Sequence, residues 1–436
     1  MSVENRNSRF YLQVLERKGA QAARKATMTS STATKTQEEI FQDYQNKAQE
    51  VMRSTSPYPR NKYKGRGIVM CAGGQTYFTC AYVAVRRLRE LGCKLPVEFW
   101  YLGPYEMNKE MVELVRPLGV TCIDAYQKRK EHPCRILNGW ELNPYSIIHS
   151  RFEEVLFLDA DNFPLVNPEF LFDTPQYKET GAIFWPDYLR LAPDRSIWKI
   201  CRVEYRDEEE FESGQIVVNK ARRWKELALT MHLNEHSDFY YRHVWGDKET
   251  YHMAWRMYDS KYSMVPFPIQ QLPVTGNSLT MCQHDFDGRR IFQHRNLDKW
   301  RYDGVNIKIP GFLYESDGLQ YVKELRSKWD GIVFKGIPDE EPSAVALRAR
   351  INKYKHFWYV VDGRSRILEF RPDGTIGAGA SHFENSWRVE HNGEKLCITI
   401  LAHPRISARL YQKPGSDLWV GYQLETGRTV AMKDRK

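Results

Sequence analysis

The feature that most constrains this chain is a short apolar run that ends in two acidic residues. The run Val155-Leu156-Phe157-Leu158 is typical of a buried strand, and Asp159-Ala160-Asp161-Asn162 follows it directly. Side chains two positions apart on an extended segment point the same way, so both carboxylates can reach one bound ion. Mg2+ and Mn2+ prefer oxygen ligands and commonly keep substrate phosphates in their remaining coordination positions. Taken alone the pair fits an acidic turn better, and the motifs that follow favour the metal site.

Length and composition indicate a globular protein of more than one domain. The 436 residues suffice for two or three domains, and the 42% hydrophobic content supports a large core. The sequence lacks an apolar run of about 18 residues, so we expect no membrane span. Residues 1–9 lack the apolar stretch of a secretory signal. We therefore expect a soluble, cytoplasmic protein, and peripheral contact with a membrane stays open.

The net charge indicates the kind of binding partner, and the cysteine spacing indicates the state of the thiols. A net charge of +9 suits an anionic partner, which is a phosphate-bearing substrate, a membrane surface or nucleic acid. The basic residues are dispersed and form no known nucleic-acid-binding pattern, so nucleic acid is not expected. The eight cysteines show no zinc-like spacing, and we expect free thiols.

The order of the predicted elements indicates an α/β domain. Residues 1–64 form a basic arm and a helix, and strand and helix patterns alternate over residues 65–328. Such alternation predicts a mainly parallel sheet covered by helices. The first strand ends at Ala72-Gly73-Gly74, where the carboxyl end of a parallel strand usually faces ligand. A plain tight turn explains the two glycines almost as well.

Residues 329–436 predict a second, antiparallel β domain. Short alternating runs are separated there by Asp362-Gly363, Asp373-Gly374 and Asn392-Gly393, which are typical hairpin turns. Its aromatic residues offer rings on which sugars can stack, although core packing is their default role. These residues are Trp387, Trp419 and Tyr422. A carbohydrate-binding protein without catalysis is therefore the alternative to an enzyme.

Further polar windows follow the acidic pair. Glu212 precedes an expected strand at residues 216–219, and Asp247 and Glu249 open a helical stretch. Carboxylates at such places contact sugar hydroxyls or a developing cation. Capping of the helix by Asp247 is the rival interpretation. We favour the functional role for Asp247 and Glu249 and leave both roles open for Glu212.

A later window supplies an imidazole and two cations. His294, Arg295 and Lys299 lie close together in the sequence, and this combination suits a metal ion with a pyrophosphate. A lone histidine is more often structural. A phosphatase of the haloacid dehalogenase type also ends a strand in such an acidic pair, but it has a small hydroxylated or branched residue where Phe163 stands.

Together these windows resemble the α-mannosyltransferases of the fungal Golgi and their bacterial or viral relatives. The matching motifs extend over roughly Gly67 to Trp300, and they are Glu153 to Asn162, Pro164, Asn167-Pro168, Glu212 to Gln215 and Gly246 to Thr250. The resemblance implies a GT-A fold, a nucleotide-sugar donor and transfer with retention at the anomeric carbon. It also implies Mn2+ or Mg2+ at the diphosphate.

The resemblance further implies a role for each matching residue. Asp159 would orient the ribose or a metal-bound water, Asp161 would bind the ion, and His294 would be the third ligand. Glu212, Asp247 and Glu249 would position the acceptor or stabilise positive charge on the sugar. Lys299 or Arg295 would meet the diphosphate. The fungal enzymes carry an N-terminal anchor and lack the β domain, so a GDP-sugar and a UDP-sugar both remain open as donor, with a glycan or another hydroxyl as acceptor.

Overall fold

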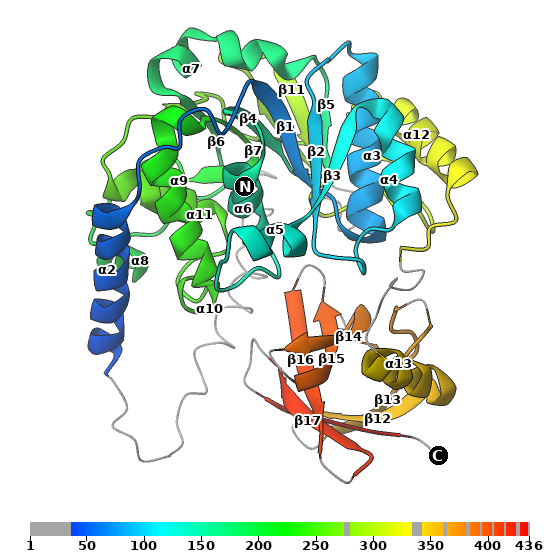
Figure 1. The fold of residues 1–436 in the computed structure, drawn as a ribbon. Coiled ribbons are helices and arrows are strands. Elements are labelled where there is room, and N and C mark those ends of the chain that lie inside the picture. Colours follow the sequence, from blue (N-terminus) through cyan, green and yellow to red (C-terminus); the bar gives the residue numbers. More distant parts are fainter. Residues whose placement is uncertain are drawn as a thin grey trace, which may run out of the picture.

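The computed structural model describes residues 36–273, 280–333, 342–361, 364–372, 374–380, 384–392, 395–402, 405–413, 416–423 and 428–434. Figure 1 shows an α/β body built on one central sheet, with an antiparallel β domain beside it. The basic arm predicted before residue 36, and residues 362–363, 373 and 393 of the predicted turns, lie outside the described residues.

The central sheet is mainly parallel. Its strand order is β3-β2-β1-β4-β7-β6-β8, and neighbours from β3 to β4 run parallel, whereas β7 runs antiparallel to both β4 and β6. This mixed sheet with helices on both faces confirms the predicted GT-A-like α/β class. The strands are β1 (Arg66–Cys71), β2 (Val97–Tyr101), β3 (Val120–Asp124), β4 (Glu154–Leu158), β6 (Ala182–Pro186), β7 (Phe211–Asn219) and β8 (Ser263–Met264).

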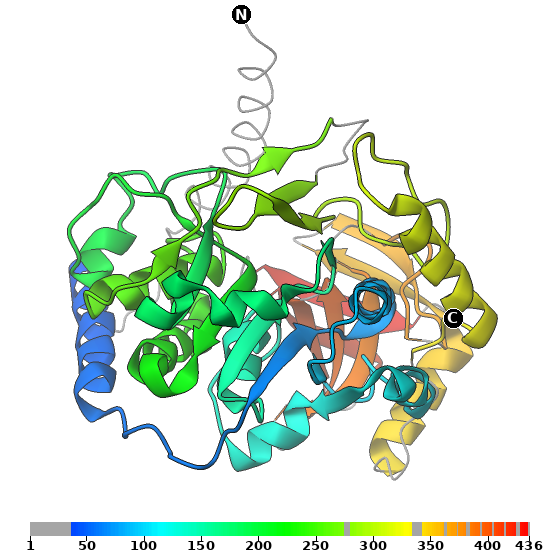
Figure 2. The ribbon, with the colours of Figure 1, turned by 90° about the horizontal axis from the view of Figure 1, so that it is seen from above.

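Helices bury both faces of this sheet because its strands carry apolar residues on both sides. Along β1, Ile68 and Met70 join the core under one group of helices, while Val69 joins the core under the other. Figures 1 and 2 show the two groups on opposite sides. One group comprises α3 (Gly74–Glu90), α4 (Lys109–Val115) and α12 (Glu315–Lys328), and the other α6 (Leu142–His149), α9 (Lys220–Glu235) and α11 (Lys248–Met257).

A small antiparallel sheet brings a late segment of the chain to the end of β4. Its order is β5-β11-β10-β9, and His294 at the end of β11 pairs with Asn162 at the start of β5. This register places His294 beside the acidic pair, although some 130 residues separate them along the chain. The strands are β5 (Asn162–Pro164), β9 (Gln270–Gln271), β10 (Met281–His284) and β11 (Arg290–His294).

The remaining helices complete the α/β body. The N-terminal helix α2 starts with a capping box, in which Thr36 accepts from the amide of Glu39 and the Glu39 side chain accepts in return. It packs beside α9 on the outside of the body (Figure 1). These helices are α2 (Gln37–Ser54), α5 (Ala125–Glu131), α7 (Pro175–Thr180), α8 (Ile197–Cys201), α10 (Ser237–Tyr240), η1 (Arg116–Leu118) and η2 (Pro168–Asp173).

The C-terminal β domain is one antiparallel sheet, as predicted, with its own core. Its order is β13-β12-β18-β17-β16-β15-β14, and helix α13 packs on it. Trp387 and Trp419 are 2% and 3% exposed and belong to this core, whereas Tyr422 is 62% exposed. The elements are α13 (Pro342–Tyr354), β12 (His356–Val361), β13 (Arg364–Glu369), β14 (Ser386–Asn392), β15 (Lys395–Ala402), β16 (Arg405–Gln412), β17 (Leu418–Gln423) and β18 (Thr429–Asp434).

One local expectation needs correction, and one rival interpretation falls away. Strand β7 begins at Phe211, so Glu212 lies inside a buried strand and not ahead of it. Asp247 does precede α11, but its side chain makes no capping hydrogen bond and instead accepts one from Asn143 Nδ2 at 3.0 Å. The tertiary contact with α6 has replaced the local cap.

Candidate active site

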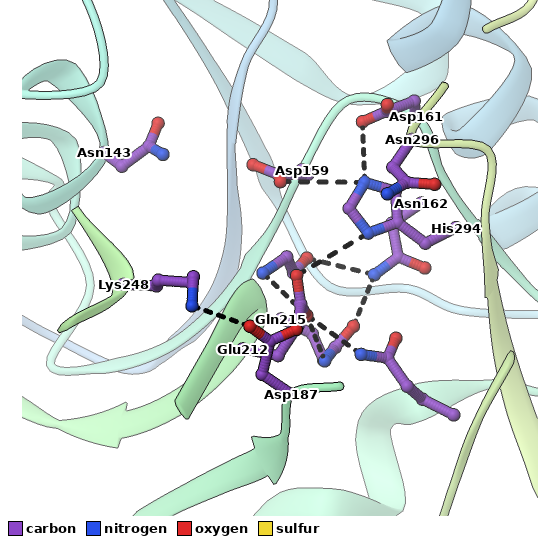
Figure 3. A network of polar contacts seen from close by, with 12 residues as sticks. Asn143, Asp159, Asp161, Asn162, Asp187, Glu212, Gln215, Lys248, His294 and Asn296 are labelled. Carbon is purple, nitrogen blue, oxygen red and sulfur yellow. Dashed lines mark hydrogen bonds and ion pairs between the residues drawn. The ribbon is translucent and has the colours of Figure 1, made fainter. Parts of the chain in front are cut away.

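Three side chains form a group that fits a divalent ion. Ligand atoms of Asp159, Asp161 and His294 all lie within 4.8 Å of one another. Nε2 of His294 lies 3.1 Å from Oδ1 of Asp161 and 3.7 Å from Oδ2 of Asp159 (Figure 3). Two carboxylates and one imidazole are ligands that suit Mn2+ and, with fewer protein contacts, Mg2+. The donor set therefore matches the ion that the sequence predicts.

The acidic pair lies in a tight turn and not on the extended strand, because β4 ends at Leu158. The amide of Asp159 donates to Gly214 O at 2.8 Å, and the amide of Asn162 donates back to Asp159 O at 3.0 Å. Nδ2 of Asn162 also donates to Gly214 O at 3.0 Å and to Gln215 Oε1 at 2.7 Å. Strand β7 thus holds the turn in which both carboxylates approach His294.

Charge on the three residues is set by burial and by their mutual contacts. Burial alone would lower the pKa of His294, but the carboxylate of Asp161, with Glu212 and Asp159, raises it to about 9. Burial would raise the pKa of Asp161, but Lys299 and His294 hold it well below its usual range. The pKa of Asp159 is raised by burial. The positive charge of His294 and the negative charge of Asp161 therefore offset each other, and a bound divalent ion would change both.

The two predicted cations behave differently. Nζ of Lys299 donates to Asp161 Oδ2 and, at 2.9 Å, to Asn296 O, so this ammonium group adjoins the metal group. The guanidinium of Arg295 is fully buried, 3.2 Å from Glu315 Oε1, and stacks over Trp300. The structure does not bring the Arg295 side chain to the metal group, although its backbone amide donates to Asp161 O at 3.0 Å. Arg295 acts here as a packing residue.

Glu212 lies behind the imidazole. Its Oε1 is 3.8 Å from Nδ1 of His294, and its Oε2 accepts hydrogen bonds of 2.9 Å from Gly214 N, Gln215 Nε2 and Gln283 Nε2. Nδ1 of His294 is buried and has no hydrogen-bond partner among the described residues. A carboxylate next to the outer nitrogen of a ligating histidine orients the ring. Glu212 is therefore placed to orient His294.

A second polar cluster surrounds Lys248. Its Nζ lies 2.6 Å from Asp187 Oδ2, 3.2 Å from Glu210 Oε2 and 3.2 Å from Glu249 Oε1 (Figure 3 shows the first contact). Glu249 is fully buried, and its Oε2 has no hydrogen-bond partner among the described residues. Burial raises the pKa of the neighbouring Asp247 to about 7.

Sequence reasoning gave no role to several residues of this site. Lys248 lies between the two predicted carboxylates, inside the window Gly246 to Thr250. Asp187 directly follows the strand β6. No local signal indicates that Asn143 contacts Asp247. Its Nδ2 reaches across from α6.

The first turn after β1 is shaped for close approach. A Cβ on Gly73 would meet Glu106 Oε2 at 2.1 Å, and Gly74 has φ +77°, so glycine is required at both positions. Helix α3 starts there without a side-chain cap or an acidic residue in its first turn. The amide of Gly74 donates to Glu106 O at 2.7 Å, so an anion would meet the amides that follow it in the first turn. The Ala72 side chain is buried in the core, so only its backbone can contact a ligand.

A second histidine and acid cluster lies elsewhere. His232, Glu235 and His236 at the end of α9 have ligand atoms within 4.8 Å of one another. His236 Nδ1 lies 3.0 Å from His232 O, and Arg135 N donates to Glu235 Oε2 at 3.1 Å. All three residues come from one helical turn.

The fold and the site together define a class. A mainly parallel sheet with two carboxylates and a histidine at the end of a central strand, beside an uncapped helix start and a lysine, is the arrangement expected of a GT-A glycosyltransferase. The chain belongs to the family described as "Mannosyltransferase putative", whose model matches residues 65–210 and 203–294.

Two fungal proteins are similar to this chain in sequence. The chain is 26% identical over 263 residues to alpha-1,2-mannosyltransferase MNN21 of Candida albicans, covering 48% of this chain and 40% of that protein. It is 24% identical over 282 residues to alpha-1,2-mannosyltransferase MNN2 of Saccharomyces cerevisiae, covering 52% and 47%. The chain thus spans less than half the length of these relatives.

Solved structures overlap only in part. The glycosyltransferase GlyE of Streptococcus pneumoniae has a TM-score of 0.32 at 15% identity, covering 47% of this chain and 45% of that one. The galactosyltransferase LgtC, solved with donor and acceptor sugar analogs, has a TM-score of 0.31 at 16% identity, covering 43% of this chain and 69% of that one.

No helix within the described residues has the length and apolar character needed to cross a membrane.

Proposed function

We propose that this protein transfers a sugar, α-mannosyl in the first instance, from a nucleotide-sugar to a hydroxyl of a glycan, with retention and with a divalent ion. The observation that supports this most directly is the convergence of Asp159, Asp161 and His294 next to Lys299. Asp159, Asp161 and His294 would hold Mn2+ or Mg2+. Such an ion supplies positive charge that neutralises the leaving diphosphate.

The residues of the chain have two tasks at the diphosphate. Negative charge accumulates on the leaving group as the bond from the anomeric carbon to the phosphate oxygen breaks. Lys299 and the first amides of α3 meet that charge in a partly buried site, where electrostatic interactions are stronger than in water. The ammonium group of Lys299 needs little movement, because Asp161 and Asn296 O already hold it.

The carboxylates act on the sugar side. Positive charge spreads over the sugar ring as the bond breaks, and Asp247, with a pKa of about 7, can present a carboxylate to that charge when ionised or donate a hydrogen bond to a sugar oxygen when protonated. Glu249 is fully buried against Lys248 and is a poor candidate for a covalent adduct. We therefore favour front-side attack. The acceptor oxygen bonds to the anomeric carbon, and its proton passes to the departing phosphate oxygen.

A carbohydrate-binding protein without catalysis fits less well. Of the three aromatic residues that suggested it, Trp387 and Trp419 are core residues, and only Tyr422 offers an exposed ring. A flat stacking surface therefore does not form from this set.

A donor panel tests the proposal. Purified protein is incubated with GDP-mannose and other GDP- and UDP-sugars, with a mannose-terminated glycan, with Mn2+ or with chelator, and released nucleotide and product are measured by mass spectrometry. We expect one donor to be consumed well above the others, only with the ion, and a product with retained configuration by NMR. Equal turnover in chelator, or an inverted product, would contradict the metal dependence or the stereochemistry respectively.

A further inference from the structure

The C-terminal β domain lies at the edge of the central sheet where the parallel strands end. Figure 1 shows β14 next to the start of α3, and side chains join the two parts. Tyr105 donates its hydroxyl to Val389 O at 3.0 Å, and Nη2 of Arg388 donates to the hydroxyl of Tyr126 at 3.0 Å. Arg388 is only 2% exposed. The contact is therefore a packed one, formed at the ligand side of the sheet.

A cavity of about 330 Å³ lies at this junction. The α/β body contributes the first turn of α3 and Lys299, and the β domain contributes residues of β14 and the segments before it. The lining includes Gln75, Tyr77, Tyr105, Asn385, Ser386 and Trp387. The volume falls within the range of ligand pockets in proteins. Rings and polar groups thus face one space from two domains.

Lys299 connects this cavity to the proposed reaction site. Its ammonium group contacts Asp161, and it also lines the cavity. Within the described part of the chain, Glu212, Asp247 and Glu249 are absent from the lining. Asp159, Asp161 and His294 do not line it either, so the cavity meets the metal group through Lys299, which is where we place the diphosphate.

We infer that the β domain is one wall of the donor site, and that the nucleoside of the donor binds between α3 and β14. This inference rests on the proposed function. The rings of Tyr77 and Tyr105 suit stacking on a base, and Asn385 and Ser386 suit hydrogen bonds to a base or ribose. Trp387 belongs to the core of the β domain and supports this wall from behind. Donor binding then draws on both domains, and the β domain contributes to catalysis by holding the leaving group.

Hydrogen exchange of the intact protein locates the nucleotide. The probes are GDP and UDP, each with Mn2+, and exchange is followed by mass spectrometry. We expect the nucleotide that binds to slow amide exchange both in residues 73–77 and in β14, and to leave β17, at residues 418–423, unchanged. Protection confined to the α/β body would overturn the inference. Failure of both nucleotides to bind would overturn it too.

A substitution that fills the cavity tests whether the β domain forms part of the donor site. Asn385 is exposed, so Asn385→Trp introduces a large ring at the cavity with little expected effect on folding. We expect the Kd for the nucleotide to rise at least tenfold by calorimetry. The matched control is Tyr422→Trp, on the exposed face of the same domain, with an unchanged Kd. An unchanged Kd in Asn385→Trp would contradict the inference.

Failure of this inference and failure of the proposed function would give different results. If the donor is turned over with Mn2+ but β14 stays unprotected and Asn385→Trp binds normally, the transferase assignment stands and the role of the β domain falls. If β14 is protected and Asn385→Trp weakens binding but no sugar is transferred, the wall stands and the proposed activity falls.

Discussion

Two clusters of histidine and acidic residues lie within the described residues, and they differ in how they are built. Asp159, Asp161 and His294 come from the end of β4 and the end of β11, and the small antiparallel sheet joins them. His232, Glu235 and His236 come from residues 232–236 at the end of α9. In both clusters the ligand atoms lie within 4.8 Å of one another.

The two clusters differ in the residues that surround them. At the first cluster, Lys299 contacts Asp161, and the same lysine lines the cavity between the start of α3 and β14. At the second, the neighbours are Arg135, which donates to Glu235, and Tyr44, whose ring meets His236 edge-on. Spacing along a helix can produce ligand geometry without a reaction site. What distinguishes the first cluster is the contact of Asp161 with Lys299, on which the proposed phosphate site rests.

Removal of Asp161 should have the largest effect. In Asp161→Ala the ion loses a ligand and Lys299 loses its partner, so we expect turnover to fall by at least about a hundredfold. Circular dichroism checks that the fold is kept, because Asp161 is buried and its loss leaves His294 and Lys299 without their shared partner. Asp259→Ala, at an exposed carboxylate, is the matched control and should keep full turnover. Near-normal turnover in Asp161→Ala would remove the distinction between the two clusters.

Glu212 should affect the ion more than the chemistry. In Glu212→Gln the group behind Nδ1 of His294 loses its charge, so we expect the Mn2+ concentration for half-maximal turnover to rise about 10- to 100-fold. Turnover at saturating Mn2+ should be largely retained, which separates an orienting role from a direct one. A loss of turnover at every Mn2+ concentration would show that Glu212 contacts the reacting sugar instead.

Burial of Asp247 should appear in the pH dependence of stability. Its pKa is raised from 3.8 to about 7, so the folded state keeps a proton that the unfolded state has lost between these values, and stability falls as pH rises through this window. Asp247→Asn does not titrate and avoids the buried charge. We expect it to be more stable than the wild type by about 2 kcal/mol at pH 8, with no such gain at pH 4, measured by urea unfolding. A gain that is independent of pH would exclude this cause.

The second cluster should give the smallest effect. We expect His236→Ala to keep turnover within twofold of the wild type, and to change the free energy of unfolding by about 1 kcal/mol or less, because its Nδ1 contact stays within one helical turn. Steady-state kinetics and urea unfolding measure the two quantities. A large loss of turnover would mean that α9 communicates with the reaction site.

Much of the fold was accessible from local patterns. The alternation of apolar strands and helices predicted the mainly parallel sheet, and the hairpin turns predicted the antiparallel C-terminal sheet, because these signals depend on residues close in sequence. The position of Glu212 inside β7 was missed because Ser213 and Gly214 interrupt the apolar pattern. A cap by Asp247 was the rival interpretation from the local sequence, and in the structure its side chain accepts from Asn143 instead.

The amino-acid sequence alone determined the class of the chain and the residues from which a site could be built, because an acidic pair after a buried strand and ordered motifs are local properties. Only the tertiary structure decided how they are used. It placed His294 beside Asp159 and Asp161 through the pairing of β11 with β5, turned Arg295 into a buried stacking residue, and set β14 against the start of α3. These outcomes depend on contacts between distant segments, whose energies no local pattern contains.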